Sequence, residues 1–478
     1  MKTLLPLIVL AAFLGSCSTD RESRPPNIIY ILADDLGYGD LSSFGQERFS
    51  TPNIDRLAKE GMKLTQHYAG CTVCAPSRSA LMTGQHTGHT PIRGNLRTPP
   101  EGQWPIPDGT FTLAEMLRQK GYVTGAFGKW GLGGPGSVGD PVNQGFDVFF
   151  GYNSQTLAHN YYPRHLWSNR EKIMLAGNEG SGKGVYAPEL IQKKAMEFLE
   201  ENRDRPFFLY YPTTIPHAEL VAPEKYMEKY RGKYLPEKSY KGAEEGDPRY
   251  REGAYNSQPE AHAAFAAMIN LLDDQVGELV NRVRELGLAD NTLIIFTSDN
   301  GPHVEGGADP VYFDSNGPFR GFKRDLYEGG IRVPTIAWWP GRIKPGSVSD
   351  LLSAFWDVFP TLAELTGQQA ADSLDGISFL PTLLGQPGQQ EHEYLYWEFH
   401  ELHGRQAVRK GDWKLVRYNV FDPENTTTEL YNIPADPGET KNLAGEHPEI
   451  VEELTTLMKQ AHTPSAVFPF PGEKQKNP

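Results

Sequence analysis

The run Asn27-Ile28-Ile29-Tyr30-Ile31-Leu32-Ala33 is followed directly by Asp34-Asp35. It is continuously apolar, whereas a strand with one wet face alternates apolar and polar residues. This pattern predicts a strand buried on both faces, as in a parallel sheet between two layers of helices. Two carboxylates at the end of such a strand are costly to bury unless they are paired or bind a cation.

Three further runs have the same form. Tyr122–Phe127 ends at Gly128-Lys129-Trp130-Gly131, Phe207–Tyr211 leads into a loop with His217, and Asn291–Phe296 ends at Ser298-Asp299-Asn300-Gly301. Ligands of open α/β sheets bind beyond the carboxyl ends of the strands. The sequence therefore predicts an α/β fold with one shared site at that edge.

Helix signals lie between these runs. Thr112-Leu113-Ala114-Glu115 has the form of a capping box, which predicts a helix that ends at Gly121. Pro259–Leu286 has helical spacing of its apolar residues. We interpret Asp273 and Asp274 on that helix as solvated or capping residues.

A second signal is the stretch Cys74-Ala75-Pro76-Ser77-Arg78, which precedes Ser79–Gly84. Cys71-Thr72-Val73-Cys74 is also a Cys-x-x-Cys pair, which fits a redox motif, half of a zinc site or a structural disulfide. Zinc is disfavoured because the third cysteine, Cys17, lies far away near the amino terminus. A thioredoxin-like role would need a short redox domain, and the chain has 478 residues.

The Cys-x-Pro-x-Arg stretch resembles the signature of the type I sulfatases of the alkaline phosphatase superfamily. In that family the cysteine is oxidised to formylglycine, whose hydrate attacks sulfur with one hydroxyl and expels sulfate by re-forming the carbonyl. The resemblance runs from Asn27 to about Thr463. It implies a sulfuric ester hydrolase with an alkaline-phosphatase-like fold, in which helices flank a central, mostly parallel sheet.

The resemblance also implies a metal site. Carboxylate and amide oxygens suit a hard cation such as calcium better than zinc. One Ca²⁺ would be held by Asp34, Asp35, Asp299, Asn300 and the formylglycine from Cys74.

The catalytic residues implied by the resemblance besides Cys74 are cations and a histidine. Arg78 lies one helical turn from Cys74, and Lys129 and Lys323 would bind sulfate oxygens. His217 would donate a proton to the leaving oxygen.

One position departs from the family. Between the Lys-Trp and the Leu-Gly after the second run, the family often has a histidine that hydrogen-bonds the formylglycine, and here this position is Gly131. Either another histidine (His86, His89 or His303) compensates, or the contact is omitted.

The substrate pocket is less sharply indicated. The segment Gly151–Trp167 carries aromatic, histidine and arginine side chains, which suit sugar rings and their hydroxyls but also fit a packed loop. The candidate substrate-binding residues are Arg93, His159, Arg164 and His303.

The amino terminus has the form of an export signal. Lys2 precedes the apolar stretch Leu4–Leu14, and Leu14-Gly15-Ser16-Cys17 resembles a bacterial lipobox, although a plain signal peptide with a chance cysteine has the same composition. We expect a signal peptide over 1–16, a tether lipidated at Cys17 over 17–26, and a protein anchored to a bacterial outer membrane, on the periplasmic side or the cell surface. The net charge of −14 argues against nucleic acid as a partner.

After Gly385 the pattern changes to short strands and a final helix over Pro448–Ala461. We expect a catalytic domain over 27–385 and a small antiparallel α+β domain over 386–470. The expected partners are a sulfated saccharide and a formylglycine-generating maturation enzyme. Two other functions fit the motifs: a phosphodiester or phosphonate hydrolase of the same superfamily, and an inactive glycan-binding lipoprotein with an unmodified Cys74.

Overall fold

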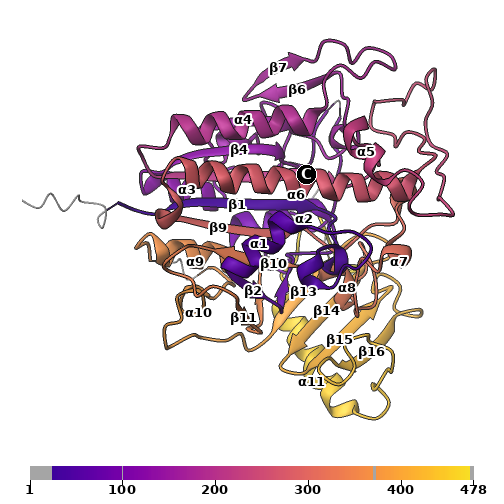
Figure 1. The fold of residues 1–478 in the computed structure, drawn as a ribbon. Coiled ribbons are helices and arrows are strands. Elements are labelled where there is room, and N and C mark those ends of the chain that lie inside the picture. Colours follow the sequence, from indigo (N-terminus) through magenta and orange to yellow (C-terminus); the bar gives the residue numbers. More distant parts are fainter. Residues whose placement is uncertain (1–23, 100, 370–372, 474–478) are drawn as a thin grey trace, which may run out of the picture.

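The computed structural model describes residues 24–473, apart from residues 100 and 370–372 (Figure 1). The predicted signal peptide and the lipidation site Cys17 lie outside the described residues. Within them, no helix combines the length and the apolar character needed to cross a membrane.

A ten-stranded sheet forms the centre of the molecule, in the order β11-β2-β10-β9-β1-β8-β4-β5-β6-β7. The five strands β9-β1-β8-β4-β5 are parallel, whereas β10, β6 and β7 run antiparallel to their neighbours. The predicted α/β fold is confirmed, with a sheet that is parallel at its centre and mixed at its flanks. The strands are β1 (Asn27–Asp34), β2 (Met62–Leu64), β4 (Val123–Lys129), β5 (Val148–Tyr152), β6 (His165–Ser168), β7 (Glu171–Met174), β8 (Phe207–Pro216), β9 (Thr292–Ser298), β10 (Thr335–Trp338) and β11 (Ser347–Ser349).

Alternate side chains of β1 fill the two cores on either side of the sheet. Ile29 and Ile31 pack with α1, α4 and α6, whereas Ile28, Tyr30 and Leu32 pack with α2, α3, α9 and α10. Both faces are buried, which is why the strand carries no alternation in its sequence. The helices of the larger part are α1 (Pro52–Glu60), α2 (Cys74–Thr83), α3 (Leu113–Gln119), α4 (Ala187–Glu201), α5 (Glu224–Tyr230), α6 (Ala261–Glu285), α7 (Pro310–Phe313), α8 (Glu328–Ile331), α9 (Val358–Leu365) and α10 (Leu380–Leu384).

Local signals set the helix ends. The Thr112 hydroxyl accepts from the Glu115 amide at 3.2 Å, and the Glu115 carboxylate accepts from the Thr112 amide at 2.9 Å, so the capping box forms as predicted. Asp273 on α6 accepts from the amides of Asn53 (3.0 Å) and Ile54 (2.8 Å) at the start of α1. It is thus a capping residue, for a neighbouring helix.

The carboxyl-terminal part is a four-stranded antiparallel sheet at the lower right of Figure 1, drawn in orange to yellow. One face packs on α11, and the other packs on the larger part through Trp397, whose ring lies 5.3 Å from Tyr68 and 5.6 Å from Trp356. Its elements are β13 (Leu395–Phe399), β14 (Arg405–Lys410), β15 (Trp413–Tyr418), β16 (Thr427–Asn432) and α11 (Pro448–Ala461).

A buried group of charges crosses the boundary between the two parts. Lys414 Nζ on β15 lies 2.9 Å from Glu328 Oε1 on α8 and 3.0 Å from Glu439 Oε1, and all three side chains are fully buried. Removing Lys414 would leave the buried Glu439 without this cation, whereas Glu328 would keep Arg332 at 3.2 Å.

We predict that Lys414→Met lowers the free energy of unfolding by about 3–5 kcal/mol, because two carboxylates lose their shared cation. The matched control is Lys410→Met on the adjacent strand, whose half-exposed ammonium pairs with Glu393 and Glu453 at the surface. The control should change stability by about 1 kcal/mol or less. Denaturant unfolding measures both, and equal losses would contradict the buried role.

We also predict a pH-dependent contribution from His462, whose Nδ1 lies 2.7 Å from Glu398 and whose Nε2 lies 2.6 Å from Glu473. Burial opposes the charge, but the two carboxylates outweigh it and raise the pKa of His462. Arg93, Tyr396 and His400 also face Glu398. A histidine whose pKa is raised by folding contributes its full stabilisation at pH values below its ordinary pKa of about 6.5. This stabilisation is lost as the pH rises through the pKa of the folded state.

Unfolding of wild type and of His462→Gln therefore should differ by about 1–2 kcal/mol at pH 6 and by less at pH 9. His447→Gln, which removes a more exposed pair with Glu449, is the control. A difference that is the same at both pH values would show that the pair does not titrate with folding.

Candidate active site

The carboxyl ends of four parallel strands deliver buried polar side chains to one place. Asp34 and Asp35 come from the end of β1, Lys129 from β4, His217 from the end of β8, and Asp299 and Asn300 from the end of β9. With α2 and the Lys323 loop, these form what we call the active-site cluster: Asp34, Asp35, Cys74, Arg78, Lys129, His217, Asp299, Asn300 and Lys323.

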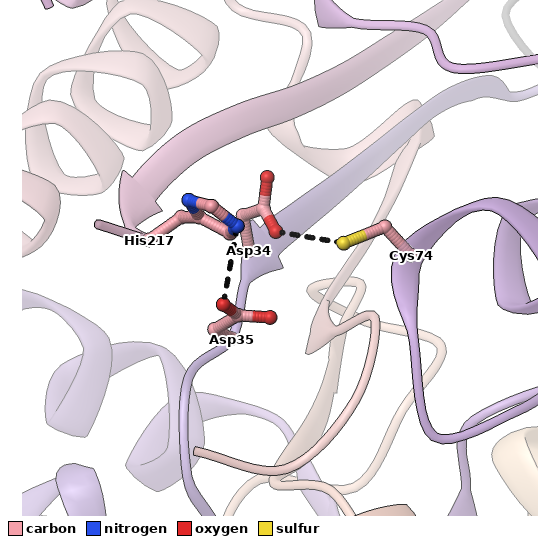
Figure 2. Close-up of side chains that lie close together, drawn as sticks. All are labelled: Asp34, Asp35, Cys74 and His217. Atoms are coloured by element: carbon pink, nitrogen blue, oxygen red, sulfur yellow. Dashed lines mark hydrogen bonds and ion pairs between the residues drawn. The ribbon is translucent and has the colours of Figure 1, made fainter. Parts of the chain in front are cut away.

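Asp34 and Asp35 both face this cluster, although neighbours in a strand normally point to opposite faces (Figure 2). The backbone of Asp35 has φ +65°, a left-handed conformation that ends the strand and redirects its side chain. Asp34 Oδ1 lies 3.5 Å from Cys74 Sγ, and Asp35 Oδ2 lies 3.5 Å from His217 Nε2.

Helix α2 begins at Cys74, so its positive amino-terminal end is at the cluster. Two residues of the same helix bind the end of β9. The Ser77 hydroxyl donates to the Asp299 carbonyl at 2.6 Å, and Arg78 donates from Nε (3.1 Å) and Nη2 (2.8 Å) to Asp299 Oδ2. Arg78 Nη1 also donates to the Lys129 carbonyl. These bonds fix the position of Cys74.

Two ammonium groups reach the sulfur of Cys74. Lys129 Nζ lies 3.3 Å away and also donates to Asp34 at 2.7 Å, whereas Lys323 Nζ lies 3.6 Å away and donates to Asp35 at 2.7 Å. Burial and the Asp34 carboxylate raise the pKa of the Cys74 thiol to about 12 despite these lysines. An unmodified thiol here is protonated at neutral pH, which makes it a poor nucleophile.

The carboxylates respond differently to burial. Burial opposes the charge of Asp34, but Lys129 and Arg78 outweigh it and lower its pKa. Burial and the neighbouring Asp34 raise the pKa of Asp299 to about 6. Asp34 is therefore firmly ionised, whereas the charge of Asp299 is less favoured, and a further cation would stabilise it.

His217 lies in a stack of three imidazoles, 5.2 Å from the ring of His159 and 5.7 Å from that of His303. Its Nδ1 donates to the Ala218 carbonyl, which leaves the Nε2 lone pair directed at the cluster. Burial, Lys323 and Lys129 lower its pKa well below the ordinary value, so this imidazole is neutral.

The oxygen atoms of the cluster fit a hard divalent cation. Ligand atoms of Asp34, Asp35, Cys74 and His217 lie within 4.8 Å of one another. Asn300 Nδ2 donates to Asp35 at 2.7 Å, while Asn300 Oδ1 is buried without a hydrogen-bond partner. A buried acceptor that has no hydrogen-bond partner and lies beside carboxylates is typical of a cation ligand before the ion binds.

Other candidate residues lie elsewhere. Arg93 donates to Glu398 at 2.7 Å, and the half-exposed Arg164 pairs with Glu252 at 3.0 Å. His86 and His89 stack on each other and face Asp375, so the hydrogen bonds described for them do not reach the cluster. Cys71 and Cys74 are both free thiols, so the disulfide alternative is wrong for this structure.

Sequence reasoning gave no role to Tyr255, whose ring lies 4.7 Å from His159 and 6.1 Å from His217. Glu305 was missed as well; its carboxylate faces His303 at 3.5 Å and pairs with Arg324. Both lie outside any regular strand or motif, so no pattern in the sequence marks them.

Comparison with known proteins identifies the family. The profile described as Sulfatase matches residues 26–368, and one described as N-sulphoglucosamine sulphohydrolase, C-terminal, matches residues 317–463. The chain belongs to the sulfatase family. It is a sulfuric ester hydrolase, and membership in this family implies a metal ion and a formylglycine at its active site.

Similar proteins cover almost the whole chain. Human arylsulfatase A is 32% identical over 94% of this chain and 89% of that protein. The N-acetylgalactosamine-6-O-sulfatase of Bacteroides thetaiotaomicron is 30% identical over 96% and 99%. Among solved structures, Ps i-CgsB in complex with k-i-k-neocarrahexaose superposes with a TM-score of 0.74 at 27% identity, covering 91% of this chain and 92% of that one.

We predict that Asp299→Ala lowers both divalent-cation affinity and turnover by more than the roughly 10- to 100-fold typical of an outer-shell partner. The control is Asp273→Ala, which removes an equally buried carboxylate from the α1 cap and should cost stability alone. Calorimetric titration of chelator-treated, folded protein measures the affinity. Unchanged metal dependence in Asp299→Ala would remove Asp299 from the ligand set.

Proposed function

We propose that this enzyme removes sulfate from a sulfated carbohydrate, with Cys74 converted to formylglycine as the nucleophile. The observation that carries the proposal is the position of Cys74. It begins α2, and two lysine ammonium groups and a carboxylate lie within 3.6 Å of its sulfur. A group here is held by cations that also suit the three peripheral oxygens of a sulfate ester.

We propose calcium as the ion, because the donors are carboxylate and amide oxygens. Asp34, Asp35, Asp299, Asn300 and the oxygen created at position 74 would hold it. When bound, the ion would act as a Lewis acid on the sulfate ester. The unpartnered Oδ1 of Asn300 supports this ligand set.

The chain's own residues have separate roles in the proposal. Lys129 and Lys323 bind sulfate oxygens and neutralise charge on the group that is transferred. His217 Nε2 is the atom through which a proton reaches the leaving oxygen. Burial and the two lysines lower the pKa of His217, and a bound sulfate anion would act against the effect of the lysines.

A carbohydrate substrate is supported by similar proteins, which include N-acetylgalactosamine-6-sulfatases. His159 and His303 remain proposed substrate residues because they stack on His217. Arg164, which is half exposed, is proposed for a more distant part of the saccharide. Arg93 is less suited, since its guanidinium is buried against Glu398.

We also propose export as a lipoprotein anchored at Cys17, followed by a tether to residue 26. Asn27 begins β1 and Asp34 ends it, so the described chain enters the sheet at the edge opposite the active-site cluster. The cluster would then face away from the membrane, towards polymeric substrates. The proposed domains are 27–385 and 386–470, supported by the start of β13 at Leu395.

The maturation enzyme is a proposed partner. Cys74 is 2% exposed in the folded chain, so conversion would have to precede folding. Mass spectrometry of the Cys74 peptide from the native host should show a lighter residue, because oxygen replaces sulfur and two hydrogens leave. An unshifted mass would favour a glycan-binding protein over an enzyme.

We predict that Cys74→Ala abolishes turnover of sulfate esters and leaves the melting temperature within a few degrees of wild type. The small residue removes the nucleophile, while Ser77 and Arg78 still hold α2. Parallel assays with sulfate and phosphate monoesters and diesters measure the activity. Retained turnover would remove the nucleophile assignment, and preferred phosphate turnover would favour a phosphoester hydrolase.

A further inference from the structure

The chain beyond β5 lies beside the Lys129 edge of the active-site cluster. Strands β4 and β5 are parallel with Lys129 opposite Tyr152, and beyond their ends the Gly131 amide donates to the Asn153 carbonyl at 3.1 Å. The residues after β5 therefore lie beside the strand end that carries Lys129. They add a fifth strand end to the four that carry the cluster.

The side chain of Gln155 fills the space beside Gly131. Gly131 has φ +80°, and a Cβ atom built there would lie 2.0 Å from Gln155 Nε2 and 2.8 Å from Gln155 Cδ. No side chain fits at position 131 while Gln155 stays in place. Gln155 therefore lies beside the strand end that carries Lys129, whose Nζ is 3.3 Å from Cys74 Sγ.

The side-chain amides of Gln155 and Asn153 have no hydrogen-bond partners among the residues that the structure describes. Both polar atoms of Gln155 and both of Asn153 are buried and unpartnered among the described residues, whereas the buried Asn178 uses its amide fully, in three hydrogen bonds. Leaving a buried polar group unsatisfied is unfavourable. At the other end of the cluster, the unpartnered Asn300 Oδ1 marks the cation site. By the same argument, the unpartnered amides of Gln155 and Asn153 indicate a site that binds hydroxyl groups.

We propose that Gln155 is a positioning residue that hydrogen-bonds the geminal diol at position 74. This rests on the proposed formylglycine. Hydration adds one water across the aldehyde: the water oxygen bonds to carbon, one hydrogen moves to the former carbonyl oxygen, and two hydroxyl groups result. Each hydroxyl donates and accepts, as an amide does, whereas the lysines only donate and the ionised carboxylates only accept.

The assignment also accounts for Gly131, which stands where the family often has a histidine. His86 and His89 are paired with Asp375, and His303 donates to the Pro216 carbonyl at 3.2 Å. Gln155 takes the place of a side chain at 131, with an amide that does not titrate. It holds the diol but cannot remove its proton, so the base that collapses the diol is not at this position.

The test compares the free-aldehyde content of folded variants. An aminooxy probe reacts with the aldehyde and not with the diol, so its labelling rate, followed by intact mass and divided by the formylglycine content of each preparation, reports the hydration equilibrium. Gln155→Ala should label about 3- to 10-fold faster than wild type, with kcat for a sulfate ester lower by a similar or larger factor. The matched control is Gln192→Ala, which removes a buried glutamine with an unpartnered Oε1 on α4 and should label at the wild-type rate.

A second variant moves the amide to the other strand end. Asn tolerates positive φ, so Gly131→Asn with Gln155→Gly restores an amide in the same space. It should return the labelling rate and kcat to within about threefold of wild type. If Gln155→Ala unfolds at a lower temperature than wild type, the double variant still tests the proposal. Wild-type labelling of Gln155→Ala, or no rescue by the double variant, overturns the proposal. A wild-type protein with no aldehyde refutes the proposed function instead.

Discussion

The buried pair between Arg78 and Asp299 is the interaction on which the rest of the active site depends. Both side chains are fully buried, and the guanidinium binds one carboxylate oxygen from two nitrogens. The other oxygen accepts from the Asp35 amide at 3.1 Å. One carboxylate thus joins α2 to the ends of β9 and β1. If the pair were broken, the buried Asp299 carboxylate would lose the guanidinium that binds it, so the helix that carries Cys74 has little freedom to move.

The charges of the cluster explain how an acidic protein binds an anion. Three carboxylates face three permanent cations, and His217 is neutral, so the cluster is balanced before any ion arrives. A divalent cation makes the balance positive, and the amino end of α2 adds to it. A sulfate ester is then attracted to this locally positive place, although the chain as a whole carries a net charge of −14.

What the sequence predicted, and what it did not, follows from the range of the interactions. Strand β1, the capping box at Thr112 and helix α11 come from local patterns, and the structure has them where the patterns place them. The left-handed turn at Asp35 has no such signal, because Asp occurs in many turns. The ion pair between Arg93 and Glu398 joins residues that are 305 positions apart in the sequence. Gln155 next to Gly131 depends likewise on the register of two strand ends, which a single sequence does not encode in readable form.

The small carboxyl-terminal part supplies none of the nine cluster residues, yet Lys323 depends on it. The loop after Lys323 is held where Arg405 donates to Asp325 at 2.9 Å, and the α8 that follows is held where the Glu328 amide donates to Glu439 at 2.6 Å. Lys414 on β15 pairs with both glutamates. Lys323, one of the two lysines that reach Cys74, is therefore positioned by contacts with the carboxyl-terminal sheet. The boundary near residue 385 separates two patterns of sequence, but the site requires both parts to be folded together.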